Sequence, residues 1–311
     1  MSNLKYNISL LPYNTFGIDA KARLFIEYYS LDELRTVLKE HKGEQILHIG
    51  QGSNLLFTKD FDGVILHSGM ARAKFLDDET VEAQNGLRLD DMIAQLTDMG
   101  YSGLEKLSLI PGEVGASAVQ NVGAYGVEAK DVIERVYTLD VETLEERVFT
   151  NEECRFGYRD SIFKHELKGK YIVTSVVYKV KPGDATKTRE EIIQTRMAKL
   201  PTVGEVGSAG SFFMNPFVSE EKANELLAQY PDMPHFPVEG ERVKIPAAWL
   251  IEQCGWKGKT LGGAQVWPKQ PLVIVNANNA TAQDIIDLAA QVSASVKEKF
   301  GIDIHPEVNY I

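Results

Sequence analysis

The chain has 311 residues, 44% of them hydrophobic and 25% charged, which is the composition of an ordinary soluble globular protein with room for two or three compact units. Its net charge of −11 and its lack of a basic run argue against nucleic acid or an anionic membrane as a partner. No stretch reaches the roughly 18 apolar residues of a membrane span, and the first residues lack a signal-peptide core. The two cysteines, Cys154 and Cys254, stand in no metal-binding pattern. We therefore expect a cytoplasmic protein with reduced thiols, no bound metal and no membrane insertion.

The first region, residues 1–67, predicts alternating strands and a helix. The expected elements are a strand at 23–29 (RLFIEYY), a helix at 31–40 and a strand at 46–49 (ILHI). Ser30 and Glu33 have the spacing of a capping box at the start of the helix. The second strand runs directly into a glycine-containing loop at 50–54, which completes a βαβ pattern.

The second region, residues 68–195, predicts shorter strands around one helix. The expected elements are a strand at 64–69 that leads into the region, a helix at 89–100, a hairpin at 133–149 and a strand at 170–181. The helix follows from four apolar residues at 3–4 spacing, namely Leu89, Met92, Ile93 and Leu96. A loop and a short helix within 182–201 lead away from the sheet, and we place a domain boundary there.

The third region, residues 196–311, predicts two helices at 219–231 and 245–255, a buried strand at 271–279 and a long final helix at 282–300. Thr281 and Asp284 form a capping box before that helix. Its apolar stripe consists of Ile285, Leu288, Val292 and Val296. The mixture of elements favours an α+β protein over one doubly wound sheet.

Two glycine-rich loops are candidate ligand sites. In the loop at 50–54 small residues let backbone N–H groups point at one anion, and Ser53 and Asn54 add side-chain donors; a plain turn is the alternative. The segment 110–126 (IPGEVGASAVQNVGAYG) carries four glycines and, among its other residues, the small Ala116, Ser117 and Ala118. Neither loop has the GxGxxG pattern of a dinucleotide fold or the GxxxxGK pattern of a P-loop, so a ligand here would need another scaffold.

Seven strings of the sequence together carry a family resemblance. They are, in chain order, NTFGIDA, GQGSNLLF, LIPGEVGASAVQNVGAYGVE, CRFGYRDSIFK, KLP, GSFFMNP and HPEV. In this order they resemble the UDP-N-acetylenolpyruvoylglucosamine reductase family of flavoenzymes. The resemblance implies an α+β fold with a two-part FAD-binding region of the vanillyl-alcohol-oxidase type in 1–67 and 68–195. It also implies a C-terminal substrate-binding domain in 196–311, whose last strand could return to the FAD region.

The resemblance implies that FAD is the cofactor, that NADPH is the reductant and that UDP-N-acetylglucosamine enolpyruvate is the substrate, reduced to UDP-N-acetylmuramate for peptidoglycan synthesis. The residues that it assigns to FAD are Gly50, Gln51, Gly52, Ser53, Asn54, Gly112, Gly115, Ala116, Ser117, Gln120, Asn121, Gly123, Ala124, Tyr125 and Gly126. For the substrate it assigns Tyr158, Lys199, Asn215 and Gln270, each of which, taken alone, is more often a solvent-facing or packing side chain.

Three residues are candidates for the chemistry. Reduction of an enolpyruvyl ether needs a hydride, stabilisation of the enolate and a proton for the α-carbon. Arg159 can hold a carboxylate bidentately, although beside Asp160 it could equally form a surface ion pair. By resemblance Ser211 is the proton donor and Glu307 acts with the arginine; locally, Ser211 also fits a turn cap and Glu307 a solvated chain end. His305 is interpreted as a bystander.

Two features depart from the family pattern. The stretch around Glu82 and Gln84 lacks a GxG-like element, which puts larger side chains near the expected flavin loops. The segment before KLP is too short for the tyrosine-bearing loop that covers substrate in the larger subgroup. These departures keep two alternatives open: a flavin-binding or UDP-sugar-binding homologue without turnover, and a sugar or alcohol oxidase of the same flavin fold.

Overall fold

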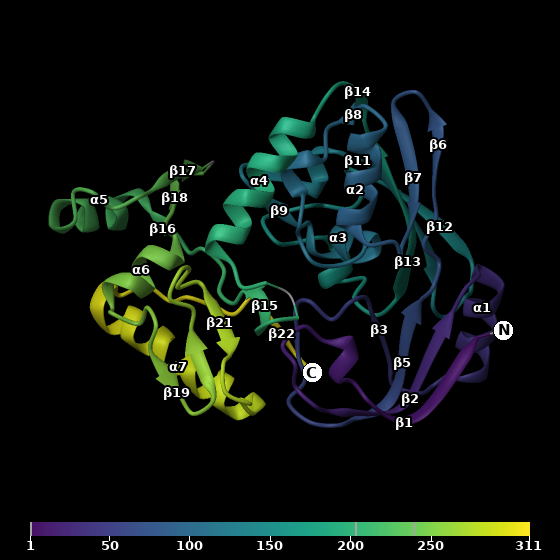
Figure 1. Ribbon diagram of the computed structural model, residues 1–311, viewed down its shortest axis with the longest axis horizontal. Helices are drawn as coiled ribbons and strands as arrows, with labels where there is room; N and C mark the ends of the chain where they lie inside the picture. The colour runs from purple at the N-terminus through teal and green to yellow at the C-terminus, as the bar shows by residue number, and fades with distance from the viewer. Residues whose placement is uncertain (1, 203, 239) are drawn as a thin grey trace. The chain divides into compact units, whose positions relative to one another are not determined.

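The computed structural model describes residues 2–202, 204–238 and 240–311, which divide into two compact units (Figure 1). Unit 1 comprises residues 1–13, 20–52 and 60–196, and unit 2 comprises 14–19, 53–59 and 197–311. The chain therefore passes from unit 1 to unit 2 within the loop at 50–54. None of the described helices is long and apolar enough to cross a membrane.

The first sheet of unit 1 has the strand order β1-β2-β5-β3. The strands are β1 (Asn3–Ser9), β2 (Lys21–Tyr28), β3 (Ile46–Ile49) and β5 (Phe61–Ser68). β2, β5 and β3 are parallel, as the predicted βαβ pattern requires, and β1 is antiparallel to β2. Helix α1 (Leu31–Glu40) buries Leu34, Val37 and Leu38.

Only half of the predicted capping box forms at the start of α1. The Ser30 hydroxyl accepts a hydrogen bond from the Glu33 backbone N–H at 3.2 Å. The Glu33 carboxylate, however, accepts from the backbone N–H of Tyr29 at 2.9 Å, one residue before the N-cap. The carboxylate still occupies the first turn, where the helix dipole favours negative charge.

The second sheet of unit 1 is antiparallel, with the order β12-β11-β13-β7-β6. Its strands are β6 (Ala73–Asp77), β7 (Thr80–Gln84), β11 (Ile133–Asp140), β12 (Glu146–Thr150) and β13 (Tyr171–Lys179). The predicted hairpin at 133–149 is confirmed as β11 and β12. Helices α2 (Leu89–Asp98) and α3 (Val114–Gln120) cover one face of this sheet (Figure 1).

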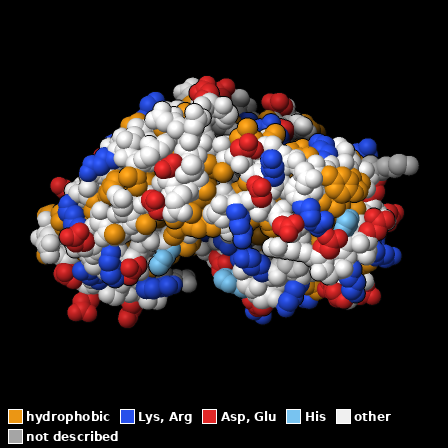
Figure 2. Space-filling model, turned by 90° about the horizontal axis from the view of Figure 1, so that it is seen from below, with side chains coloured by type: hydrophobic (Ala, Val, Ile, Leu, Met, Phe, Trp, Pro, Cys, Tyr) orange, Lys and Arg blue, Asp and Glu red, His pale blue; other side chains and the backbone are white. Residues whose placement is uncertain are grey.

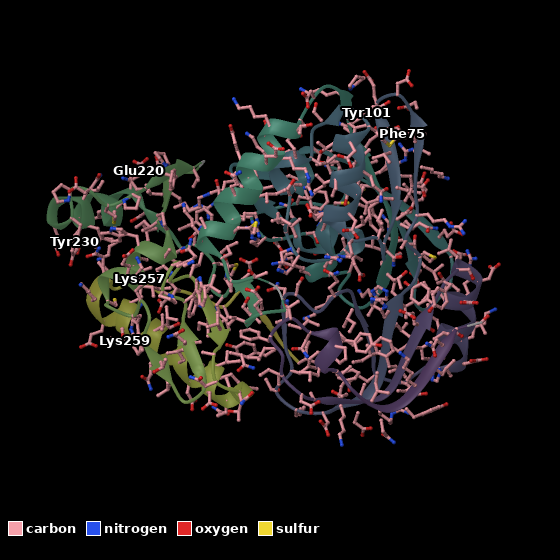
Figure 3. All side chains as sticks on the ribbon, viewed as in Figure 1. Phe75, Tyr101, Glu220, Tyr230, Lys257 and Lys259 are labelled. Carbon is pink, nitrogen blue, oxygen red and sulfur yellow. The ribbon has the colours of Figure 1, made fainter. Side chains whose placement is uncertain are left out.

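Short elements complete unit 1. They are the 3₁₀ turns Leu11–Tyr13, Glu105–Leu107, Ala129–Asp131 and Ile162–Lys164 and the two-residue strands β8 (Tyr101–Ser102), β9 (Gly123–Ala124), β10 (Val127–Glu128) and β14 (Lys181–Pro182). The rings of Phe75 on β6 and Tyr101 on β8 lie 4.7 Å apart, as Figure 3 lets the reader follow. The helix predicted within 182–201 is α4 (Thr186–Lys199), which contains no fully buried residue, although the Nε of its Arg196 is shielded from solvent. The Arg189 guanidinium holds it to Asp90 at 2.6 Å.

Unit 2 contains a four-stranded sheet, a three-stranded sheet and a two-stranded parallel pair. The four-stranded sheet has β15 (Gly207–Ser211), β21 (Val273–Asn276), β20 (Ala264–Val266) and β19 (Thr260–Leu261). The three-stranded sheet has β16 (Phe217–Ser219), β18 (Arg242–Lys244) and β17 (Phe236–Val238). The parallel pair joins β4 (Leu55–Leu56) to the last strand, β22 (Asn309–Tyr310). The last strand thus lies beside the segment that follows the first glycine loop.

The helices of unit 2 are α5 (Glu220–Gln229), α6 (Ala247–Gln253) and α7 (Ala282–Phe300). Figure 3 labels Glu220 and Tyr230, which mark the two ends of α5. The predicted stripe of α7 is fully buried in the core of the unit. Mixed sheets and helices in both units agree with the predicted α+β class. The predicted three-part division at residues 67 and 195 remains a prediction.

The capping box at the start of α7 forms in both directions. The Thr281 hydroxyl accepts from the Asp284 N–H at 3.1 Å, and the Asp284 carboxylate accepts from the Thr281 N–H at 2.8 Å. Replacing Thr281 by alanine is expected to lower the free energy of unfolding by about 1 kcal/mol, measured by urea denaturation. The matched control is Gln283→Ala in the same turn, which removes only an exposed contact to Asp287 and should change stability by a few tenths of that amount. Equal effects of the two changes would contradict the cap assignment.

Candidate active site

The two glycine-rich loops meet within unit 1. The backbone N–H of Gly112 donates to the Gln51 side-chain oxygen at 2.9 Å. A Cβ placed on Gly50 would lie 3.0 Å from the carboxylate of Glu113, so the Gly50 backbone packs directly on the start of α3. Gly112 itself has φ of +128°, which side chains rarely tolerate. These contacts assemble bare backbone from both segments in one place, as the sequence predicts.

The segment after α3 is a tight hairpin. Strands β9 and β10 are joined by Tyr125 and Gly126, with φ of +51° and +79°, the pattern of a type I′ turn. Tyr125 is 42% exposed, which leaves its ring available to a ligand. A Cβ on Gly123 would come 2.8 Å from the Val127 carbonyl oxygen, so only glycine fits this position of the hairpin.

Several predicted cofactor residues are engaged within the protein. Ser117 is buried, and its hydroxyl contacts the Val114 carbonyl and, at 2.6 Å, the Tyr178 hydroxyl. Gly115 packs so closely on Asn85 that a Cβ would lie 2.9 Å from it. The Asn121 side chain donates to the Gly157 carbonyl at 2.6 Å and accepts from the Lys130 N–H. Gly115, Ser117 and Asn121 therefore stabilise this segment through contacts within the protein.

Arg159 is anchored beside the β9–β10 hairpin. Its Nη2 donates to the Gly123 carbonyl at 2.7 Å, and its guanidinium lies 5.3 Å from the Tyr158 ring centre. Its backbone has φ of +55°, a strained conformation for a non-glycine residue and one that clusters at functional sites. Lys164 supports the turn by donating to the Arg159 carbonyl at 2.8 Å and to the Gln120 side chain at 2.9 Å. The salt bridge of the neighbouring Asp160 joins it to His165. The structure thus places Arg159, Tyr158, Gln120 and Tyr125 around one hairpin.

Ser211 and Glu307 come together within unit 2. Ser211 ends β15 after an irregularity in the pairing with β21, the kind of feature that redirects side chains near active sites. The next residue, Phe212, is buried, and its carbonyl accepts from the Glu307 N–H at 2.7 Å. The Glu307 carbonyl in turn accepts from the Asn54 side chain at 3.2 Å. One connected strip therefore carries the predicted proton donor, the predicted glutamate and the end of the first glycine loop.

The predicted substrate residues of unit 2 fall into two groups. The Lys199 carbonyl accepts from the Trp267 indole at 3.0 Å, and the Gln270 carbonyl accepts from Val273 in the turn that follows, so these two residues border the same loop. Asn215 instead accepts from the Ala247 N–H at 2.9 Å, at the start of α6. His305 is exposed and uses its carbonyl to receive the Met214 N–H.

The departures at Glu82 and Gln84 have structural partners. Both lie in β7; the Glu82 carboxylate accepts from the Ser175 hydroxyl at 2.8 Å and pairs with Lys74 at 3.2 Å. The Gln84 side chain accepts from the Arg72 N–H at 3.0 Å. Both side chains are therefore held by contacts along the sheet. In the linker before KLP, only residues 183–185 separate β14 from α4, which leaves no room for the tyrosine-bearing loop.

Comparison with known proteins identifies the family. A family model described as UDP-N-acetylenolpyruvoylglucosamine reductase, C-terminal domain, matches residues 201–311, and one described as FAD binding domain matches residues 22–143. The UDP-N-acetylenolpyruvoylglucosamine reductase of Bacteroides fragilis is 47% identical over 333 positions, covering 99% of this chain and 100% of the relative. The chain belongs to the UDP-N-acetylenolpyruvoylglucosamine reductase family. The predicted resemblance is confirmed.

Further comparisons agree with this membership. The reductase of the same name from Neisseria gonorrhoeae is 42% identical over 340 positions, covering 100% of this chain and 98% of the relative. The crystal structure of the Thermus caldophilus reductase has a TM-score of 0.76 and 24% identity, covering 100% of this chain and 99% of that one, which confirms the fold.

As a member of this reductase family the chain is an oxidoreductase, and FAD is its cofactor. The geometry of unit 1 is compatible with such a group: the Gly112 N–H contacts Gln51, which brings backbone of the segments 50–52 and 112–126 together, and Gly50 and Gly123 pack too closely on neighbouring protein atoms to accept a Cβ. Among the described residues, one buried side-chain nitrogen or oxygen lacks a hydrogen-bond partner, the Nε of Arg196. Burial lowers the pKa of Arg196, an effect that the nearby Tyr125 hydroxyl partly offsets. An unpaired donor beside Tyr125 is what a bound acceptor would satisfy.

Sequence reasoning missed a cluster beneath these loops in the reductase. His67 contacts both Glu27 and Glu113 in unit 1, although no prediction used any of the three residues. The available signal was a charged or titratable residue within an otherwise apolar strand, as in RLFIEYY and VILHS. No group of His, Cys, Asp and Glu side chains among residues 2–202, 204–238 and 240–311 is arranged to hold a metal ion.

Proposed function

We propose that this chain reduces UDP-N-acetylglucosamine enolpyruvate to UDP-N-acetylmuramate with NADPH as the reductant, a step in the synthesis of peptidoglycan precursors. The observation that carries the proposal is the full-length similarity to reductases named for this substrate, with both the FAD-binding and the C-terminal family models matched. FAD, when bound, would supply the redox chemistry by which hydride from NADPH reaches the enolpyruvyl β-carbon. A cytoplasmic location remains a prediction from the sequence.

In this proposal Arg159 holds the enolpyruvyl carboxylate. Its guanidinium is a permanent, planar cation that can bind a carboxylate through two parallel N–H···O bonds. Its bond to the Gly123 carbonyl fixes the side chain before substrate arrives. A donor that is fixed in advance stabilises the developing enolate without reorganisation during the reaction.

Ser211 gives its proton to the α-carbon, and Glu307 helps to polarise the enolpyruvyl group. Support for this pair comes from their positions on neighbouring segments of unit 2, joined by the bond from the Glu307 N–H to the Phe212 carbonyl. The buried rings of Phe212 and Phe213 anchor the segment that follows Ser211, so that the hydroxyl is carried on rigid backbone.

The diphosphate and sugar are assigned to Lys199, Asn215 and Gln270, with Tyr158 on the enolpyruvyl side. A lysine ammonium suits a diphosphate as a point charge, and amide side chains offer both donors and acceptors to sugar hydroxyls. On the face shown in Figure 2, acidic and basic side chains both occur among uncharged ones. The proposed contacts are therefore local and do not depend on an overall positive charge.

An anaerobic flavin titration tests the proposal. Purified holoprotein is expected to lose its visible flavin absorption when NADPH is added and to recover it when UDP-N-acetylglucosamine enolpyruvate follows. Bleaching without recovery would favour a binding homologue without turnover. Oxygen consumption with simple sugars or alcohols, and none of the expected recovery, would instead favour an oxidase of the same flavin fold.

A further inference from the structure

A partly buried glutamate–histidine–glutamate cluster in unit 1 includes Glu113, whose carboxylate lies beside Gly50. His67 on β5 places its Nδ1 3.0 Å from Glu27 Oε1 on β2 and its Nε2 3.1 Å from Glu113 Oε1 before α3. The Glu113 side chain is only 6% exposed. Both ring nitrogens thus face carboxylate oxygens, and only the doubly protonated imidazolium can donate to both of them.

The pKa directions agree with a proton held in this cluster. Burial alone would lower the pKa of His67, but the hydrogen bonds and charges of Glu113 and Glu27 outweigh it and raise that pKa. Burial raises the pKa of Glu113, and His67 offsets part of this effect. For Glu27, burial is outweighed by hydrogen bonds from Tyr29 and His67, so its pKa is lowered. The directions for His67 and Glu27 thus favour a charged ring beside a charged Glu27 carboxylate, in agreement with the contacts of both ring nitrogens.

Glu113 connects this cluster to the loops assigned to the flavin. Its carboxylate is the nearest group to a Cβ built on Gly50, and its backbone precedes α3. The flanking backbone is fixed, because Leu89 N–H donates to the Gly112 carbonyl at 3.0 Å and Val114 N–H donates to the Leu87 carbonyl at 2.9 Å. A change in the charge or position of the Glu113 side chain therefore changes the electrostatic and packing environment of the Gly50 loop.

We propose that His67 is a positioning residue for the flavin: by bridging Glu27 and Glu113 it holds the start of α3 against the Gly50 loop and balances the charge of Glu113 there. The inference rests on the proposed function, with the Gly50 loop assigned to FAD as the resemblance implies, and it places the FAD diphosphate at this loop, where small residues let backbone N–H groups point at an anion. A bare carboxylate beside that diphosphate would repel it, because both are anions at short range in a partly dehydrated site. The imidazolium removes this repulsion.

The other titratable groups near the cluster define its surroundings. They are Lys5, Tyr13 and Tyr29 on the Glu27 side, Tyr28 and His48 beneath β5, and Arg88 near Glu113. Burial lowers the pKa of His48 to about 3 and raises that of Tyr28 to about 12, so both stay neutral between pH 6 and 8.5. The pKa of Lys5 is raised, so Lys5 stays charged over this range. The pKa of His67 is raised from an ordinary value of 6.5, which itself lies inside this range.

The sign of the pH dependence follows from the raised pKa of His67. The compensating charge is present at pH values below this pKa and is lost as pH rises through it. FAD affinity, measured by titrating apoprotein with FAD and following the quenching of flavin fluorescence, is expected to fall about tenfold from pH 6 to 8.5, equivalent to 1.4 kcal/mol. In Glu113→Gln, which has no charge to balance, affinity should stay constant over the same range.

A double-variant comparison separates charge balance from simple packing. His67→Gln leaves Glu113 uncompensated and should bind FAD about tenfold more weakly than wild type at pH 6. Adding Glu113→Gln to it should restore affinity to the level of Glu113→Gln alone. The matched control is His41→Gln, which removes a histidine–glutamate pair of 2.8 Å at the end of α1, away from the glycine loops, and should leave affinity unchanged.

The outcomes are distinguishable. If wild-type affinity is flat with pH, or if the double variant binds FAD as weakly as His67→Gln, the positioning role is wrong. If His67→Gln does not fold, the wild-type and Glu113→Gln pH profiles decide the question without it. If wild-type protein binds no FAD at any pH, the failure lies with the proposed function itself.

Discussion

A Ser211→Ala variant is expected to keep its FAD and to be reduced by NADPH at the wild-type rate, yet to return electrons to UDP-N-acetylglucosamine enolpyruvate about 10²- to 10⁴-fold more slowly. The reason is that the hydroxyl is assigned to protonation of the α-carbon, a step that follows flavin reduction. Loss of a general acid should therefore slow only the second half of the reaction. Anaerobic stopped-flow measurement of each half-reaction separates the two rates.

The structure supplies a control for this prediction. Ser208 lies on the same strand, and its backbone pairs with Val275 and with Thr15, as expected for a strand residue. Ser208→Ala removes a hydroxyl from the same glycine-rich stretch but from before the pairing irregularity. It should leave the rates of both half-reactions within about twofold of wild type. A substitution that creates no cavity and leaves no buried polar group without a partner usually changes the stability of a protein little. Equal flavin reoxidation in Ser211→Ala and wild type would remove Ser211 from the proton-donor role.

The elements were predictable where one local signal was strong. Helix α1 and helix α7 have the expected bounds, because each combines a serine or threonine N-cap with regularly spaced apolar residues. The hairpin β11–β12 followed from two β-rich runs around a turn. The sequence did not predict that the segment 53–59, which contains β4, belongs to unit 2. β4 pairs with β22, whose residues are far away in sequence, and the pairing involves only two residues from each strand.

The residues assigned to the site remain predictions, and what the structure adds is the set of contacts that support their segments. The approach of Gln51 to Gly112 and of Glu307 to Phe212 agrees with the loops and strings read from the sequence. The half-formed capping box at Ser30 differs from expectation because Glu33 reaches Tyr29, a choice set by side-chain geometry in the folded state. Glu113 had no signal of its own, because its role depends on His67, which lies 46 positions away.

Replacing Arg159 by glutamine is expected to lower kcat/KM for the UDP-enolpyruvyl sugar by about 10²- to 10³-fold, the range found when one preorganised stabilising donor is removed. The loss should appear in kcat as well as in KM, because the guanidinium is assigned to charge that grows as the enolate forms. Arg159→Lys should recover only part of the rate, since an ammonium keeps the charge but cannot form the planar bidentate contact.

The same segment offers a control arginine for that experiment. Arg155 is 69% exposed and pairs with Glu166 at 2.5 Å, so Arg155→Gln removes a cation from the same loop without touching the β9–β10 hairpin. It should keep nearly full activity, because exposed ion pairs contribute little. Since Arg159 also donates to the Gly123 carbonyl, FAD content must be measured in each variant. If Arg159→Gln loses activity only in proportion to lost FAD, the residue supports the hairpin and does not stabilise the enolate.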